Sequence, residues 1–134
     1  MMITMGTRGY GKTYLTTLKE NKYHNKKVEY KGIVFDSIKE KNRYLYLKDL
    51  EYGKKIKELE LQKEFELQES FVDNNGKKQR AIHYIVDFFY YDNEKKYYVA
   101  EDVKSKATRE DKTYRLKAKI FMYQYPNIVF KEIV

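Results

Sequence analysis

The chain contains no cysteine and no tryptophan, and it has only one proline and two histidines among 134 residues. The absence of cysteine excludes a disulfide framework, Cys-ligated zinc, iron–sulfur clusters and thiol catalysis. Two histidines, His24 and His83, are too few for a His-rich metal site. One proline and six glycines leave little sequence for a flexible linker between domains. We therefore expect one folded domain that does not depend on disulfides.

Long apolar runs are missing as well, since no stretch approaches the roughly 18 to 20 uncharged residues that a membrane helix needs. The first residues, MMITMGTRGYGKT, have no apolar core followed by a cleavage site, so secretion is not indicated. A cytoplasmic protein without a membrane partner is the resulting expectation. Positive charge is in excess: 28 Lys and Arg against 20 Asp and Glu give a net charge of +8, which favours an acidic partner.

The sequence pattern predicts an α/β domain with the order helix, three antiparallel strands, helix, strand. Asp36 and Ser37 favour a helix entry, and this helix is expected to end near Gly53. A second helix is expected at residues 108–125, with Thr108 as its N-cap. Strands are predicted where apolar, β-branched and aromatic residues recur, and a DNNG turn follows the first of them; the strands cover 59–71, 80–91, 95–105 and 128–134.

Two acidic residues and a lysine gather on two neighbouring predicted strands. Asp102 and Lys104 are two residues apart, so their side chains point to the same face. Asp87, in the run IVDFF, joins them only if the hairpin pairs residues whose numbers sum to an odd value, because an even sum would separate them. Two carboxylates that lie close together repel each other unless a cation lies between them. Oxygen ligands of this kind suit Mg²⁺ or Mn²⁺.

Five blocks in this order resemble the PD-(D/E)XK nuclease superfamily: YKGIVFDSIKEKNRYLYL, IKELELQKEFEL, YIVDFFYYD, VAEDVKS and TYRLKAKIFMYQYPNIVFKEI. More closely, they look like a small phage-encoded nuclease-like family related to Holliday-junction resolvases. The resemblance covers residues 22–134 and leaves residues 1–21 as a leader outside it. It implies a restriction-endonuclease-like core and a metal-dependent endonuclease that acts on branched DNA as a homodimer, in the host cytoplasm.

The same resemblance implies roles for individual residues. Asp87 and Asp102 correspond to metal ligands, together with the main-chain carbonyl of Val103, and Lys104 corresponds to the lysine that orients or activates the attacking water. Glu40 corresponds to a glutamate that reaches the metal from the first helix. Its alternative is a capping box, in which Glu40 reaches back to the helix start. Gln62 matches a polar position near the site and has no assigned role.

Two further features have alternative interpretations. The second predicted helix has a basic face that is expected to flank the catalytic face and to contact phosphates, unless it is only a solvated surface; its residues are Lys112, Arg115, Lys117 and Lys119. In the leader, GTRGYGKT at residues 6–13 satisfies the pattern of a phosphate-binding P-loop. A working P-loop needs a strand inside a parallel sheet, whereas the remaining chain predicts antiparallel strands, so no obligatory nucleotide is expected. A catalytically silent DNA-binding or scaffold module on the same fold is the other alternative.

Overall fold

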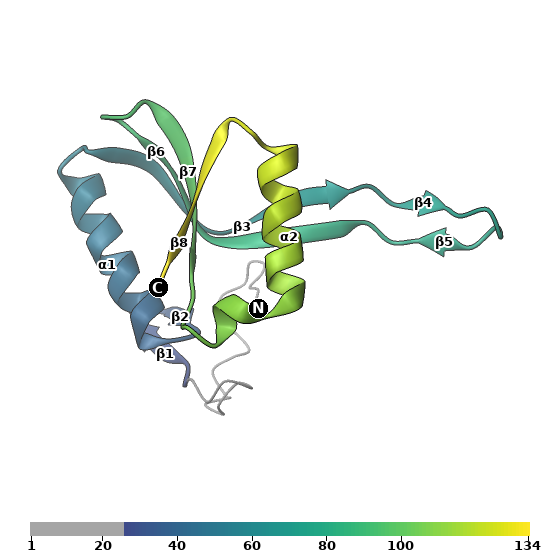
Figure 1. Ribbon diagram of the computed structural model, residues 1–134. Helices are drawn as coiled ribbons and strands as arrows, with labels where there is room; N and C mark the ends of the chain where they lie inside the picture. Colours follow the sequence, from purple (N-terminus) through teal and green to yellow (C-terminus); the bar gives the residue numbers. More distant parts are fainter. Residues whose placement is uncertain (1–25) are drawn as a thin grey trace.

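The computed structural model describes residues 26–134. The leader, including the P-loop-like string at residues 6–13, lies outside the described residues. The helices and strands follow one another along the chain as β1 (Val28–Tyr30), β2 (Ile33–Phe35), α1 (Ile38–Tyr52), β3 (Ile56–Gln68), β4 (Phe71–Val72), β5 (Lys78–Gln79), β6 (Ile82–Asp92), β7 (Tyr97–Val103), the 3₁₀ turn η2 (Thr108–Glu110), α2 (Lys112–Gln124) and β8 (Ile128–Ile133) (Figure 1).

The centre of the fold is a four-stranded mixed sheet with the strand order β3-β6-β7-β8. β3 pairs antiparallel with β6, and β6 pairs antiparallel with β7. β8 pairs parallel with β7, which requires the crossover that α2 provides. The predicted α/β class is therefore confirmed. Neither α1 nor α2, the two α-helices of the described residues, is long and apolar enough to cross a membrane.

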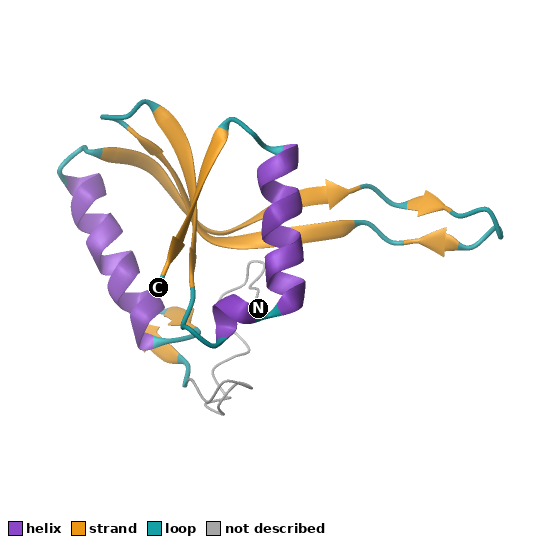
Figure 2. Cartoon of the chain, viewed as in Figure 1, coloured by secondary structure: helices purple, strands orange, loops and turns teal. Residues whose placement is uncertain are grey.

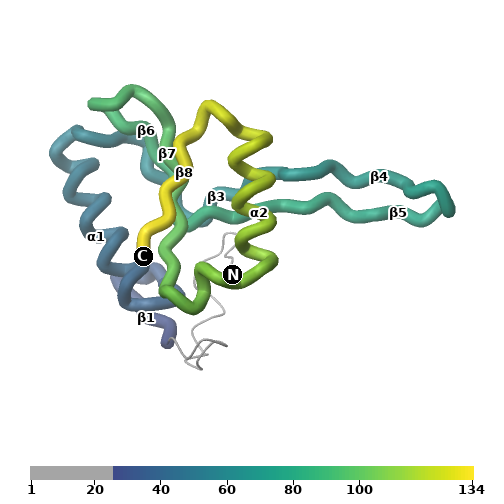
Figure 3. Tube along the Cα trace, in the orientation of Figure 1, coloured from purple at the N-terminus to yellow at the C-terminus, as the bar shows by residue number. Residues whose placement is uncertain are grey.

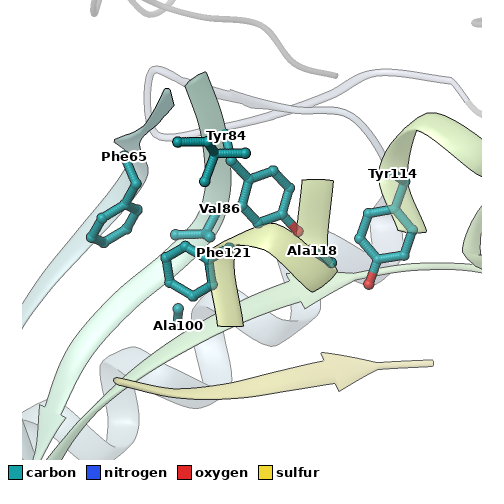
Figure 4. Packing of buried hydrophobic residues seen from close by; sticks show 8 residues of the cluster. Phe65, Tyr84, Val86, Ala100, Tyr114, Ala118 and Phe121 are labelled. Atoms are coloured by element: carbon teal, nitrogen blue, oxygen red, sulfur yellow. The ribbon is translucent and has the colours of Figure 1, made fainter. Parts of the chain in front are cut away.

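The two helices cover opposite faces of this sheet (Figure 2). Adjacent residues of β7 show the division, because side chains alternate along a strand. Val99 packs in a buried cluster with Leu47 of α1, whereas Ala100 packs in a second cluster with Phe121 of α2. Figure 4 shows that second cluster, with Tyr114 at one end of it. The β6–β7 hairpin therefore contributes residues to the cluster on the α1 side and to the cluster on the α2 side.

The helix ends follow local capping chemistry, with one correction to the prediction. Ser37 caps α1 by accepting a hydrogen bond from the N–H of Glu40, and Gly53 ends this helix, as expected. α2 does not start at Thr108, since its N-cap is Asp111, whose carboxylate accepts from the N–H of Tyr114. Thr108 is engaged by Ser105 instead: the side chain of each accepts a hydrogen bond from the backbone N–H of the other. The chain then turns as η2 before the helix begins.

Strand β3 departs from the simple alternation that the sequence suggests. Leu59 and Leu61 pack against the α1-side cluster, whereas Phe65 and Leu67 belong to the α2-side cluster, although all four are odd-numbered. The change falls at Gln62, whose backbone adopts φ +54°. The paired strand β6 changes face at the same place, between Val86 and Phe88, so both strands contribute to both cores. The predicted strand is present, but its apolar residues do not all pack on one face.

The predicted DNNG turn is present at the tip of a long two-stranded arm (Figure 3). The arm continues β3 and β6 beyond the sheet through β4 and β5, which pair Phe71 with Gln79 and Val72 with Lys78. Asp73 closes the turn, because its Oδ1 accepts from the N–H of Asn75 and of Lys77 at 2.9 Å each. Gly76 supplies the left-handed residue of the turn at φ +81°.

Candidate active site

The β6–β7 hairpin has the register that brings its two aspartates together. It pairs Phe88 with Glu101 and Phe89 with Ala100, so the residue numbers sum to an odd value. The backbone N–H of Asp87 donates to Asp102 Oδ1 at 3.2 Å. The N–H of Val103 in turn donates to Asp87 Oδ2 at 2.8 Å. Both carboxylates are thus fixed by backbone donors where the two strands meet.

Glu40 joins this pair from α1, and it is only 5% exposed. Its Oε1 accepts from the backbone N–H of Asp36 at 3.1 Å, which supports the start of the helix. Its Oε2 accepts from Gln62 Nε2 at 3.2 Å and so belongs to the site. Glu40 therefore reaches back to the helix start with one oxygen, at the N–H of Asp36 rather than that of Ser37, and its role as a metal ligand stays a prediction.

Gln62 lies at the centre of the group. Its Nε2 donates to Glu40 Oε2 and also to Asp87 Oδ1, at 3.3 Å. Its Oε1 is buried and has no hydrogen-bond partner among residues 26–134. A non-glycine residue at positive φ inside a strand costs on the order of 1 kcal/mol and is commonest at functional sites. The strained backbone, the bridging amide and the orphan oxygen together give Gln62 a place in the site that the sequence pattern left without a role.

Asp102 has an additional partner, Tyr84, which the sequence analysis did not single out. The Tyr84 hydroxyl donates to Asp102 Oδ2. Tyr84 lies on β6 three residues before Asp87 and is buried against α2 (Figure 4). Its own pKa is raised, first by burial and then by the charge of Asp102, so the phenol stays protonated as a donor. A tyrosine in a strand normally indicates packing, and nothing in the sequence marks this one as a carboxylate partner.

All three carboxylates resist ionisation. Burial is the largest cause that raises the pKa of Asp87, and the charge of Lys104 and the backbone donor from Val103 oppose it. Burial and then the charge of Asp87 raise the pKa values of Glu40 and of Asp102 well above their ordinary range. The charge of Asp87 thus disfavours ionisation of both of its neighbours, and a cation between these acids would stabilise them as anions.

Lys104 lies beside the aspartates without pairing with either. Its ammonium stands 4.2 Å from the centre of the Tyr114 ring, at the start of α2. Within residues 26–134 it makes no ion pair with a carboxylate. Its charge nevertheless lowers the pKa of Asp87 and of Asp102. The lysine is therefore near enough to act electrostatically on the site and has hydrogen-bond donors to offer to a further group.

The donor set suits a hard divalent ion, although the carboxylates are not arranged around one. In the part of the chain that the structure describes, no three His, Cys, Asp or Glu side chains are grouped as metal ligands. Their hydrogen bonds are to protein groups: the Gln62 amide donates to both Glu40 and Asp87, and the Tyr84 hydroxyl and a backbone N–H donate to Asp102. Buried carboxylates and the orphan Oε1 of Gln62 offer the oxygen ligands that Mg²⁺ or Mn²⁺ prefers.

Within residues 26–134, none of the four basic residues of α2 forms an ion pair with these carboxylates. Lys112, Arg115 and Lys119 are exposed, whereas Lys117 is half-buried beside the core-facing side of the helix. Arg115 pairs with Glu110 at 3.0 Å. Their role as phosphate contacts remains a prediction.

A second buried carboxylate, one residue before Asp102, has a different environment. Glu101 is fully buried and points toward α1, where Arg43 donates from Nε and from Nη2 to its two oxygens at 2.8 Å each. The Tyr90 hydroxyl donates to the same carboxylate. The hydrogen bond to Glu101 is the largest cause that raises the pKa of Arg43. Glu101 was not predicted as a partner of Arg43, because 58 residues separate them.

Comparison with known proteins gives one match. Residues 20–134 match a family described as "Protein of unknown function (DUF1064)". No curated protein and no solved structure matches the chain.

Proposed function

The chain belongs to the DUF1064 family, and from its site we propose that it is a metal-dependent DNA endonuclease with the restriction-endonuclease-like core of the PD-(D/E)XK nucleases. The observation that carries the proposal is the proximity of three carboxylates with raised pKa values, the buried Glu40 and Asp102 and the half-buried Asp87, with Lys104 beside them. Its resemblance to phage-encoded resolvase relatives makes branched DNA the proposed substrate and a homodimer the proposed assembly. The net charge of +8 suits a polyanion.

In this proposal Asp87, Asp102, Glu40 and the main-chain carbonyl of Val103 hold Mg²⁺ or Mn²⁺. Such an ion would lower the pKa of a water molecule and stabilise charge at phosphorus. Water attacks the phosphorus and the P–O3′ bond breaks, which leaves a 5′ phosphate and a 3′ hydroxyl. Lys104 orients the water and offsets the negative charge on the phosphoryl oxygens.

The remaining contacts of the site hold these groups in place. The Tyr84 hydroxyl and the N–H of Asp87 fix the carboxylate of Asp102, and the N–H of Val103 fixes that of Asp87. Partners that orient metal ligands affect metal affinity and activity almost as much as the ligands themselves. Tyr84 is therefore a positioning residue in this proposal.

A catalytically silent DNA-binding module on the same fold is the second candidate. The observation in its favour is that the three carboxylates are already satisfied by hydrogen bonds and are not grouped around a metal position within residues 26–134. Cleavage of a labelled four-way junction, measured beside linear duplex and single strand with Mg²⁺ or Mn²⁺, decides between the two. Cleavage that needs the metal supports the endonuclease. Binding without cleavage of any substrate supports the silent module.

A further inference from the structure

The arm, residues 69–81, is the one part of the described chain that projects from the body of the domain (Figures 1 and 3). An isolated two-stranded hairpin is at best marginally stable in water, yet this one is well organised. Asp73 accepts hydrogen bonds from the N–H of Asn75, the N–H of Lys77 and the Nε2 of Gln79. These hydrogen bonds, that of Gln79 first, lower the pKa of Asp73. The tip is therefore a preformed ribbon rather than a loose loop.

The charges of the arm are arranged asymmetrically. Its returning strand presents three exposed cations, Lys77, Lys78 and Arg80, and none of them forms an ion pair within the described residues. The carboxylate of Asp73 is used inside the turn. The outgoing strand presents two apolar side chains, Phe71 at 46% exposure and Val72 at 65%. An unpaired basic edge beside exposed apolar groups indicates an interaction surface.

We propose that this arm lies in the major groove of B-form DNA, with Lys77, Lys78 and Arg80 on the phosphates. The proposal rests on the proposed function only in taking DNA as the partner. Five residues from Glu69 to Asp73 extend about 16 Å at roughly 3.3 Å per residue. The major groove is about 12 Å wide and 8.5 Å deep and admits a two-stranded ribbon. Phe71 and Val72 lie on opposite faces of the ribbon, so one of them can then meet base edges, including the methyl group of thymine.

Charge separates this partner from a second copy of the chain. Two arms that packed on each other would bring six cations together, three from each copy, in addition to a net charge of +8 on each chain. DNA offers the opposite charge along the length of the arm, and each phosphate contact releases a counterion. A-form RNA has a deep, narrow major groove that side chains do not read, so an RNA duplex is a weaker match for the ribbon.

The test compares two charge-matched variants of the full chain. One carries Lys77→Gln, Lys78→Gln and Arg80→Gln in the arm. The other carries Lys54→Gln, Lys95→Gln and Lys96→Gln, which are exposed residues at the opposite end of β3 and β6. Affinity for a labelled duplex of about 20 base pairs, roughly two helical turns, is measured by fluorescence anisotropy in EDTA over a series of salt concentrations.

The arm variant is expected to bind duplex DNA about tenfold or more weakly and to lose about 2.7 units of salt slope, 0.9 for each phosphate contact. The control variant should keep the parent's slope. The arm variant should lose less affinity for single-stranded DNA and for duplex RNA than for duplex DNA. Equal losses on all three ligands, or equal losses in the two variants, would overturn the groove assignment, since they would show only a general effect of charge.

A second variant replaces residues 69–81 by Asn-Gly, which joins β3 to β6 through a two-residue hairpin turn. It should keep the parent's circular dichroism and melting temperature and show the same loss of duplex affinity. If it dissociates a parent dimer in sedimentation instead, with unchanged affinity per chain, the arm binds a second copy and the proposal fails. A parent that binds no duplex also overturns it. A parent that binds through the arm but never cleaves leaves the arm assignment standing and removes only the nuclease proposal.

Discussion

Glu101 and Asp102 are neighbours on β7, and both carboxylates are buried. They face opposite sides of the strand and have different partners there. Glu101 faces α1 and meets a bidentate guanidinium from Arg43. Asp102 faces the other way and meets a phenol, a backbone N–H and a second aspartate. Its nearest cationic influence is Lys104, which makes no ion pair with it. One strand therefore carries a neutralised carboxylate and an unneutralised one in adjacent positions.

This difference separates a structural charge from a functional one. A buried ion pair with full hydrogen bonding holds two elements of the fold together, and its two charges neutralise each other. Glu40, Asp87 and Asp102 have raised pKa values and form no ion pair within residues 26–134, which fits the cation site that we propose for them. We therefore assign Arg43 and Glu101 a role in stabilising the fold, and we assign Glu40, Asp87 and Asp102 to the candidate site.

The largest expected effect concerns chemistry on the Asp102 side. Asp102→Asn and Lys104→Ala should each reduce the cleavage rate of a junction by about 10³-fold or more, because one removes a proposed metal ligand and the other removes charge stabilisation at phosphorus. DNA affinity should stay close to that of the parent, or rise for Asp102→Asn, which deletes a negative charge. Single-turnover cleavage and anisotropy measure the two quantities. Variants that cut as fast as the parent would place the activity elsewhere.

On the other side of β7 the expected effect is on stability. Arg43→Met leaves the carboxylate of Glu101 buried without its cation and should lower the free energy of unfolding by about 3 to 5 kcal/mol. Lys48→Met is the matched control on the same helix: it removes an exposed pair with Glu51, which is worth less than about 0.5 kcal/mol. Urea unfolding measures both. If the two variants lose equal stability, the contrast drawn for Glu101 is wrong.

A smaller effect is expected at Gln62. Gln62→Leu removes an amide that can turn its Oε1 toward the carboxylates, so the affinity for Mn²⁺ should fall roughly tenfold, the lower end for partners of a metal site. Gln68→Leu, on the exposed end of β3, is the control. Calorimetric titration reads the affinity without reference to activity. If Gln62→Leu binds Mn²⁺ as tightly as the parent, the amide only bridges Glu40 and Asp87 and has no part in metal binding.

Local chemistry explains the features that the sequence could predict. Ser37 and Gly53 mark the ends of α1 because capping depends on neighbouring residues alone. The odd register of the β6–β7 hairpin was one of two alternatives, and the short turn closed by Asp92 selects it. The proximity of Asp87 and Asp102 is a consequence of that register.

The features that the sequence could not predict depend on long-range contacts or on unusual backbone geometry. Gln62 reaches the site from a backbone with positive φ, and no local pattern signals this conformation. Tyr84 and Arg43 find their carboxylate partners through tertiary packing, 18 and 58 residues away in the chain. The N-cap of α2 was misplaced because Thr108 and Asp111 both suit the position, and Thr108 bonds to Ser105 instead.

The smallest expected effect is the pH dependence of stability, because the change is spread over several pH units. Burial raises the folded-state pKa of Glu40, Asp87 and Asp102, so the folded protein holds protons that the unfolded chain has released. Stability is then greatest below the ordinary carboxyl pKa, near 4, and is lost as pH rises through the raised values. In EDTA the melting temperature should therefore fall from about pH 5 to pH 8. Asp102→Asn should flatten this decline, and Asp49→Asn, at an exposed position, should leave it unchanged. A melting temperature that rises with pH over this range would show that the three acids are ionised at no cost, and the distinction from Glu101 would disappear.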